Sequence, residues 1–264
     1  MLILLVLIKA TLAALVVVVA TIAVERAGPF WGALIASLPI AATPAYIVIG
    51  LEHPPEFVTA SLLSSLSSNA AVFVLLTAMM FLATRLRNLL ALVISLAIWL
   101  GVVLVIQQLE WTPLAALLLN LAACASGIAV ARAWPPKPVV IARGRLRTWE
   151  IALRAALVAA LIGTISIVGE VIGPSATGVL AVFPVVYTSM SAILLLRHGG
   201  EATAAMMANS FVPLMGFAIA VLAAHLATAA FGVWPGLAIG LAVSFTCAVT
   251  LMAWRRLRVR SAVS

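Results

Sequence analysis

Two short segments place a histidine three residues before a glutamate, and such pairs can bind a metal ion or relay a proton. His53 precedes Glu56, and His198 precedes Glu201. A glutamate in the first turn of a helix and a histidine just after the preceding helix also stabilise the two helix ends without any chemistry. We therefore treat the four residues as candidates for gating or proton coupling, and expect neither a metal site nor a cofactor.

Charged residues within apolar stretches form a second candidate group. Lys9 and Glu25 of one stretch correspond to Arg154 and Glu170 of a later one. If the two stretches cross a membrane in opposite directions, Lys9 comes level with Glu170, and Arg154 comes level with Glu25. Such pairs could close alternately as gates. The alternative is that Lys9 and Arg154 extend to the membrane surface and that Glu150 pairs with Arg154.

Two prolines, Pro39 and Pro184, lie in the middle of apolar stretches and have hydroxyl side chains nearby. A proline inside a helix removes a backbone donor, and in lipid such backbone is tolerated where it is buried or lines a wet cavity. Each proline could mark a packed kink, or a broken helix whose ends bind a solute. The candidate substrate-binding residues are Pro39, Thr43, Asn69, Pro184, Tyr187, Thr188 and Asn209.

A row of serines precedes Asn69. Ser61, Ser64, Ser65 and Ser68 fall at helical spacing on one face. Small polar residues at this spacing more often join membrane helices to one another than line a pore. The functional interpretation remains open for Asn69 and Asn209.

The elements that must position these residues are set by an internal repeat and by composition. Residues in the first part of the chain recur 145 positions later, in the pairs Glu25 and Glu170, Gly28 and Gly173, Pro29 and Pro174, Pro39 and Pro184, Thr43 and Thr188, His53 and His198, and Glu56 and Glu201. A repeat without gaps indicates a duplicated unit. In a chain this apolar, it indicates the pseudosymmetry found in transporters.

Hydrophobic residues make up 66% of the 264 residues and charged residues 8%. This composition is typical of an integral membrane protein, and the apolar runs of about twenty residues fit helices that cross a bilayer. We expect an all-α polytopic protein with nine spans, at about 2–24, 31–50, 57–83, 88–107, 113–132, 150–169, 176–196, 202–226 and 234–254. Spans 1–4 match spans 6–9, and span 5 links them.

Nine spans that alternate in direction place the Lys- and Arg-containing segments between them on one side of the membrane. By the positive-inside rule that side is cytoplasmic. The N-terminus is then outside and the C-terminus inside a bacterial inner membrane. The two four-helix repeats become inverted: residues 1–110 form repeat one, 111–149 form the linker span and a basic loop, and 150–264 form repeat two. The net charge of +8 is thus a topology signal, and we expect no nucleic-acid partner.

The segment with Gly28-Pro29, an apolar run and Pro39, followed by Gly50-Leu51-Glu52-His53, resembles the small GlpM-like inner-membrane proteins. The likeness covers about sixty residues in each copy. It implies an inner-membrane location and a tandem fusion of two such units that once paired as an antiparallel dimer. It implies no catalytic residue.

The sequence contains no aspartate and none of the common nucleotide-binding, zinc-protease or serine-hydrolase motifs. We therefore expect no enzyme activity. The leading hypothesis is a secondary transporter or exporter of a small solute, such as an anionic metabolite, with proton coupling as an option. The alternatives are a passive channel, a membrane enzyme or metal-handling protein that uses the His-x-x-Glu pairs, a scaffold, or a lipid flippase. The expected partners are the bilayer and a small-molecule solute, and a homodimer is left open.

Overall fold

The computed structural model describes residues 8–16, 18–19, 42–86, 89–137 and 148–261, without the side chains of 168, 170, 255–256 and 258–261. These residues are helical apart from short turns, as predicted for an all-α chain. Residues 8–16 and 18–19 belong to the first predicted span. The later helices are α3 (Ala42–Glu52), α4 (Pro55–Leu82), α5 (Leu89–Ile106), α6 (Pro113–Ala133), α7 (Thr148–Ala181), α8 (Val185–Arg197), α9 (Gly199–Ala208), α10 (Phe211–Phe231) and α11 (Val233–Ser261).

The chain is a multi-pass membrane protein by the length and hydropathy of its helices. Within the described residues, six helices or helix parts can each cross a bilayer, and a bent pair of helices can form a seventh span. They match predicted spans 3 to 9. The first two predicted spans, 2–24 and 31–50, lie largely outside the described residues, so the count of nine stays a prediction.

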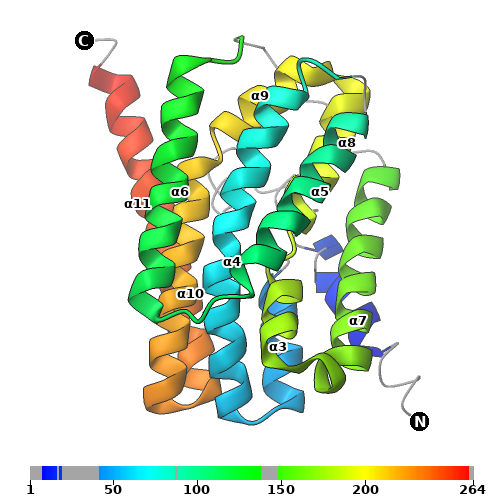
Figure 1. Cartoon of the computed structure of the whole chain (residues 1–264), viewed down its shortest axis with the longest axis vertical. Coiled ribbons are helices and arrows are strands. Elements are labelled where there is room, and N and C mark those ends of the chain that lie inside the picture. The colour runs from blue at the N-terminus through cyan, green and yellow to red at the C-terminus, as the bar shows by residue number, and fades with distance from the viewer. Residues whose placement is uncertain (1–7, 17, 20–41, 87–88, 138–147, 262–264) are drawn as a thin grey trace.

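Helix α4 is the central element of the bundle (Figure 1). Of its most apolar 18 residues 72% are buried, whereas in the other five spanning helices the corresponding share is 22% to 44%. It contacts α5, α6, α7, α9 and α10. A helix that is covered on all sides can carry polar residues, because neighbouring helices supply their hydrogen-bond partners.

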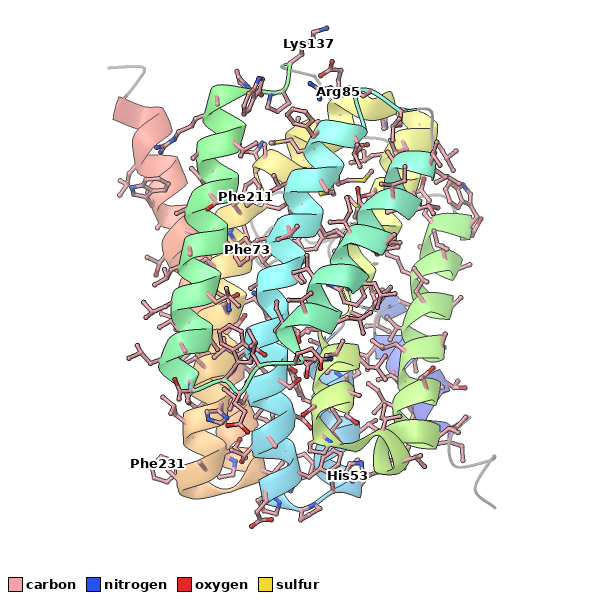
Figure 2. All side chains as sticks on the ribbon, in the orientation of Figure 1. His53, Phe73, Arg85, Lys137, Phe211 and Phe231 are labelled. Carbon is pink, nitrogen blue, oxygen red and sulfur yellow. The ribbon has the colours of Figure 1, made fainter. Side chains whose placement is uncertain are left out.

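The two ends of the bundle differ in charge. Figure 2 shows Arg85 and Lys137 at one end and His53 and Phe231 at the other. Helix α8 also ends at Arg197 on the first of these ends, and α11 with its arginine-rich last turns finishes there (Figure 1). We call this end the basic end and the other the opposite end. The described Lys- and Arg-containing segments between the spans therefore lie at one end of the bundle, as the sequence predicts.

Helices that lie about 145 residues apart in the sequence run in opposite directions (Figure 1). Helix α4 runs toward the basic end and α10 runs away from it. Helix α3 ends at the opposite end, next to the start of α4, whereas its counterpart α8 ends at the basic end. Likewise, α5 starts at the basic end and α11 finishes there.

The predicted span at 202–226 is two helices rather than one, since α9 ends at Ala208 and α10 starts at Phe211. Pro213 lies in the first turn of α10, where a missing backbone N–H costs nothing. In a continuous helix, the same proline would lose a hydrogen bond and clash with the preceding turn. The Phe211 ring fills the break: it stacks on Phe73 of α4 with centroids 6.4 Å apart (Figure 2) and lies directly on Gly127 of α6.

Helices α10 and α11 pack closely along a glycine-containing face. Gly232 makes the turn between them with φ 88°, a conformation that glycine adopts without strain. On α11, a Cβ atom added at Gly236 would lie 2.6 Å from the Cα of Thr228, and one added at Gly240 would lie 2.7 Å from the Cβ of Ala224. The spacing is that of the G-x-x-x-G motif, which lets membrane helices approach closely.

We expect Gly236→Ala to destabilise the protein by about 1–3 kcal/mol, because the added methyl group meets backbone that cannot rotate away. The matched control is Gly101→Ala on α5, where nothing lies within 4 Å of the added Cβ and the substitution should be neutral or slightly stabilising. Thermal unfolding of both variants in one detergent is the measurement. Equal melting temperatures for the two variants would contradict the close packing of α10 on α11.

Candidate functional site

The predicted seventh span is broken at Pro184. Gly173, with φ 76°, first divides α7 into residues 148–172 and 174–181. The second part ends at Ala181, α8 starts at Val185, and the two helices meet at an angle of 48°. Pro184 has φ −77° and ψ 57°, which is not helical. The helix is therefore interrupted at Pro184, and whether its ends bind a solute, as one of the two interpretations holds, stays a prediction.

The break lies near the middle of the bundle. The Trp99 ring, in the middle of α5, packs edge-on against Phe183, with centroids 5.3 Å apart. Phe183 and Pro184 interrupt the backbone hydrogen-bond ladder here, and turn bonds replace it, from Phe183 N to Leu180 O at 3.0 Å and from Val185 N to Phe183 O at 2.7 Å. Polar backbone at this depth must be covered by protein or by a polar ligand.

Serines of α4 hold the part of α7 that precedes the break. Ser64 Oγ donates to the carbonyl of Ser175 at 2.7 Å, and Ser65 Oγ donates to the carbonyl of Gly178 at 2.7 Å. Helix α7 can come this close because residue 178 is glycine: an added Cβ would lie 2.2 Å from the Ser61 carbonyl oxygen. The predicted joining role of the serine row is confirmed for these two hydroxyls.

Two amide side chains connect the same serine row to α5 and α6. Gln107 Nε2, just after α5, donates to Ser64 Oγ at 3.0 Å and to Ser68 Oγ at 2.8 Å. Asn120 of α6 is fully buried, accepts a hydrogen bond from Asn69 Nδ2 at 2.8 Å, and donates to the Leu66 carbonyl at 2.7 Å. The result is a polar network that ties four helices together inside the apolar bundle.

The chain contains two tyrosines, and each lies beside a serine of the neighbouring helix in the bundle. The Tyr46 hydroxyl of α3 lies next to Ser65, and the Tyr187 hydroxyl of α8 lies next to Ser210. Ser65 and Ser210 occupy corresponding positions of the two copies, 145 residues apart. Ser65 donates to a carbonyl of α7, and the Tyr46 hydroxyl makes no hydrogen bond within the described residues.

Several further buried polar groups have no hydrogen-bond partner in the described part of the chain. Most lie on α3, α4, α5 and α8, on the elements around the break. Ser95 lies one turn from Trp99 on α5, and Thr188 lies one turn beyond Pro184 on α8. Hydroxyl and indole groups of this kind can donate to a small polar solute or to water. They are Tyr46, Ser61, Ser95, Trp99, Thr188 and Ser191.

A cavity of about 300 Å³ lies beside these helices, between α3, α4, α10 and α11. Its wall is apolar apart from Thr43 and Tyr46. Among the lining residues, Ile47 is 42% exposed and Trp234 51% exposed. The cavity is therefore a groove that opens sideways, on the face of the bundle that meets lipid.

Two ion pairs lie toward opposite ends of the bundle, and each joins two helices of the same half. Lys9 pairs with Glu52 at the end of α3, near the opposite end. At the basic end, Arg197 Nη1 lies 2.5 Å from the fully buried Glu150. Each pair joins the first helix of a copy to the end of its second helix, and the charges at the corresponding positions 52 and 197 are reversed. The sequence predicts that Lys9 pairs with Glu170, whereas in the described residues Lys9 pairs with Glu52.

The two His-x-x-Glu pairs lie at opposite ends of the bundle. His53 stacks on Phe57 with centroids 3.8 Å apart, while Glu56 lies in the first turn of α4. His198 lies between α8 and α9, and Glu201, in the first turn of α9, pairs with Lys137. Both glutamates thus occupy the helix-start position that the sequence predicts. Among the described residues, no three His, Cys or Glu side chains come together.

The structure divides the predicted substrate-binding residues among several places. Pro184 and Thr188 lie at the break, with Tyr187 beside them. Thr43 lines the sideways groove, and Asn69 bonds Asn120. Asn209 is exposed at the turn between α9 and α10, where its Nδ2 donates to the Ala205 carbonyl at 2.8 Å. Pro39 and Glu25 lie outside the described residues, as does the side chain of Glu170. Arg154 contacts Met190 through Nη2.

Sequence reasoning missed Trp99, Gln107 and Asn120. The signal was present, because an asparagine within the apolar run at 113–132 is costly in lipid and must find a partner inside the protein. The fifth span was treated as a linker, so its polar residue was not considered. Gln107 was overlooked because it follows the last residues of an apolar run and has the position of an ordinary surface residue.

Comparison of the chain with protein-family models, with curated proteins and with solved structures finds no match. The function is therefore argued from the arrangement of the residues alone.

We expect the Asn69–Asn120 pair to be coupled energetically. Asn120→Ala removes a donor and an acceptor from a fully buried site, and should cost about 1–2 kcal/mol. Asn69→Ala should cost less when Asn120 is already alanine, so the two effects should not add. Chemical or thermal unfolding of the double-mutant cycle gives the coupling.

Ser126→Ala is the matched control on α6, since this serine is exposed and its hydroxyl donates to the Ala122 carbonyl of the same helix. It should stay within about 0.5 kcal/mol of the parent protein. Additive effects at positions 69 and 120 would show that the amide contact contributes nothing to the packing of α4 against α6.

Proposed function

We propose that the chain is a secondary carrier that moves a small polar solute across a bacterial inner membrane by alternating access between two inverted halves. The observation that carries the proposal is the broken span at Pro184, at the mid-depth of the bundle, with buried donors without partners around it. Broken helices with such surroundings form the substrate sites of many carriers.

The inverted relation of the halves is supported by helix direction and by corresponding contacts. Helices α3, α4 and α5 run opposite to α8, α10 and α11 (Figure 1). The tyrosine–serine contacts use corresponding serines, Ser65 and Ser210. Two halves with similar internal packing and opposite orientation can exchange conformations, so that an outward-open state becomes an inward-open one. With this assignment, the basic end is cytoplasmic, and the halves are the tandem units of a GlpM-like ancestor.

A neutral hydrogen-bonding solute fits the site better than an anion. The groups without partners near the break are hydroxyls and an indole, which donate hydrogen bonds but carry no charge. The cations Lys9 and Arg197 are paired with carboxylates, and Arg154 contacts Met190. In this proposal, the two ion pairs help to close the ends of the bundle, and His53, Glu56, His198 and Glu201 remain the candidates for proton coupling.

Alternating access predicts that position 188 is reached by water from each side of the membrane in turn. With Cys124 and Cys247 replaced by alanine, Thr188→Cys should react with a membrane-impermeant maleimide added to either side of oriented proteoliposomes. The matched control is Val186→Cys on the same helix, which is 47% exposed on the lateral face. In lipid it should react from neither side.

The outcomes separate the alternatives. A reporter at position 188 that reacts from neither side would overturn the carrier proposal and favour a packed scaffold. Reaction from both sides together with ionic currents far above carrier turnover would instead identify a channel. Thermal-shift screening of polyols, amino acids and organic acids then gives the solute class, with polyols expected to stabilise the parent protein more than Thr188→Cys.

An amphipathic lipid is the second candidate substrate, favoured by the sideways groove. The groove places an apolar wall beside Thr43 and Tyr46, so an acyl chain could lie in it with a polar group near the tyrosine. If lipids are moved, proteoliposomes with the purified chain should let dithionite quench most of a fluorescent phospholipid. Quenching of only the outer half, as in protein-free vesicles, would exclude this candidate.

A further inference from the structure

A second cavity of about 300 Å³ lies at the basic end, away from the break and the groove. It is formed where α4 and α6 end and α9 begins. Its polar residues are Thr84 and Arg85 after α4, Lys137 after α6, and Glu201 of α9. We call it the basic-end pocket. Of its residues, only Glu201 enters the proposed transport, as a candidate for proton coupling.

The Arg85 guanidinium is held in a fixed place on this pocket. It lies 3.7 Å from the centroid of the Phe81 ring, and Nη1 donates to the Phe81 carbonyl at 2.9 Å. An arginine has five N–H donors in a planar fork. Within the described residues, the hydrogen bond to the Phe81 carbonyl uses only Nη1. The remaining donors are available to a ligand, and such a fork suits the oxygens of a phosphate group.

Lys137 adds a second cation that is held loosely. Its Nζ lies 3.6 Å from Glu201 Oε1, and its side chain is 81% exposed. The backbone N–H of Lys137 donates to Glu201 Oε2 at 3.3 Å, so the glutamate mainly anchors the chain after α6. Two cations and one carboxylate give the pocket a net charge of +1, which complements a single phosphodiester.

The pocket also has the apolar wall that a lipid needs. The Trp134 ring packs edge-on against Phe81, with centroids 5.7 Å apart, and is 59% exposed. Exposed tryptophans at the ends of spans mark the level of the lipid headgroups. Helix α6, which leads from this pocket into the membrane-spanning part of the bundle, is among the least covered helices. Only 22% of its most apolar 18 residues are buried, so acyl chains can lie along it.

We propose that the basic-end pocket binds the headgroup of an anionic phospholipid, with the phosphate on Arg85 and Lys137 and the acyl chains along α6. Basic pockets between membrane helices are typical sites for such lipids. The aromatic wall and the position at headgroup depth favour a lipid over a soluble phosphate. The bound lipid would join the ends of α4, α6 and α9, and so stabilise this end of the bundle.

Native mass spectrometry and thermal unfolding of the full chain in a neutral detergent test the proposal. We expect phosphatidylglycerol to bind about ten-fold more tightly than phosphatidylcholine and to raise the melting temperature. Arg85→Ala and Lys137→Ala should each weaken phosphatidylglycerol binding several-fold. If Arg85→Ala does not fold, the exposed Lys137 still provides the test.

Arg132→Ala is the matched control, because this arginine lies in the last turn of α6, at the same end, but does not line the pocket. It should keep the binding of the parent protein. Equal losses for Arg132→Ala and the two pocket variants would overturn the proposal in favour of general surface charge. Equal binding of phosphatidylcholine would also overturn it, and equal stabilisation by inorganic phosphate would identify a soluble anion as the ligand.

Discussion

The arrangement of the bundle depends on one constraint: a polar group in the membrane interior must find its partner within the protein. Helix α4 carries a serine row and an asparagine through the middle of the bundle, and this is tolerated because neighbouring helices surround it. Its hydroxyls bond carbonyls of α7, while Gln107 and Asn120 bond it from α5 and α6. The polar residues therefore fix which helices become neighbours of α4, while the apolar residues only require that it be covered.

The same constraint explains why the break at Pro184 is informative. A proline that frees backbone groups at mid-depth is costly unless protein or a ligand covers them. On the side of α7, serines of α4 satisfy the carbonyls of Ser175 and Gly178. On the side of α5 and α8, hydroxyls and the Trp99 indole are buried without partners among the described residues. One side of the broken span is thus held in place, and the other offers unmet donors to a solute.

The sequence predicted those features that follow from local chemistry. Apolar length predicted the spans from α4 onward, and Pro184 marked the place where a kink or a break was expected, because each depends on the residues nearby. The division of the eighth span at Asn209 was not predicted, although Pro213 indicates it, since prolines in the first turn and in the interior of a helix look alike in sequence. Pairings such as Lys9 with Glu52 were missed because they depend on how each helix is rotated about its axis. The prediction compared only the depths of charged residues in the membrane, and depth does not determine rotation.

Two positions 145 residues apart have opposite charges and yet both form ion pairs at the ends of their helices. Position 52 is a glutamate and position 197 an arginine, yet each forms an ion pair with the first helix of its own copy, through Lys9 in one case and Glu150 in the other. A cation at position 197 suits the basic end, and a carboxylate at position 52 suits the opposite end. With the proposed inversion, the positive-inside rule favours a cation at position 197 and not at position 52. The partners Lys9 and Glu150 are not at corresponding positions, because position 9 corresponds to Arg154. An ion pair between the first two helices is therefore present in both halves, but a differently placed residue of the first helix makes it in each.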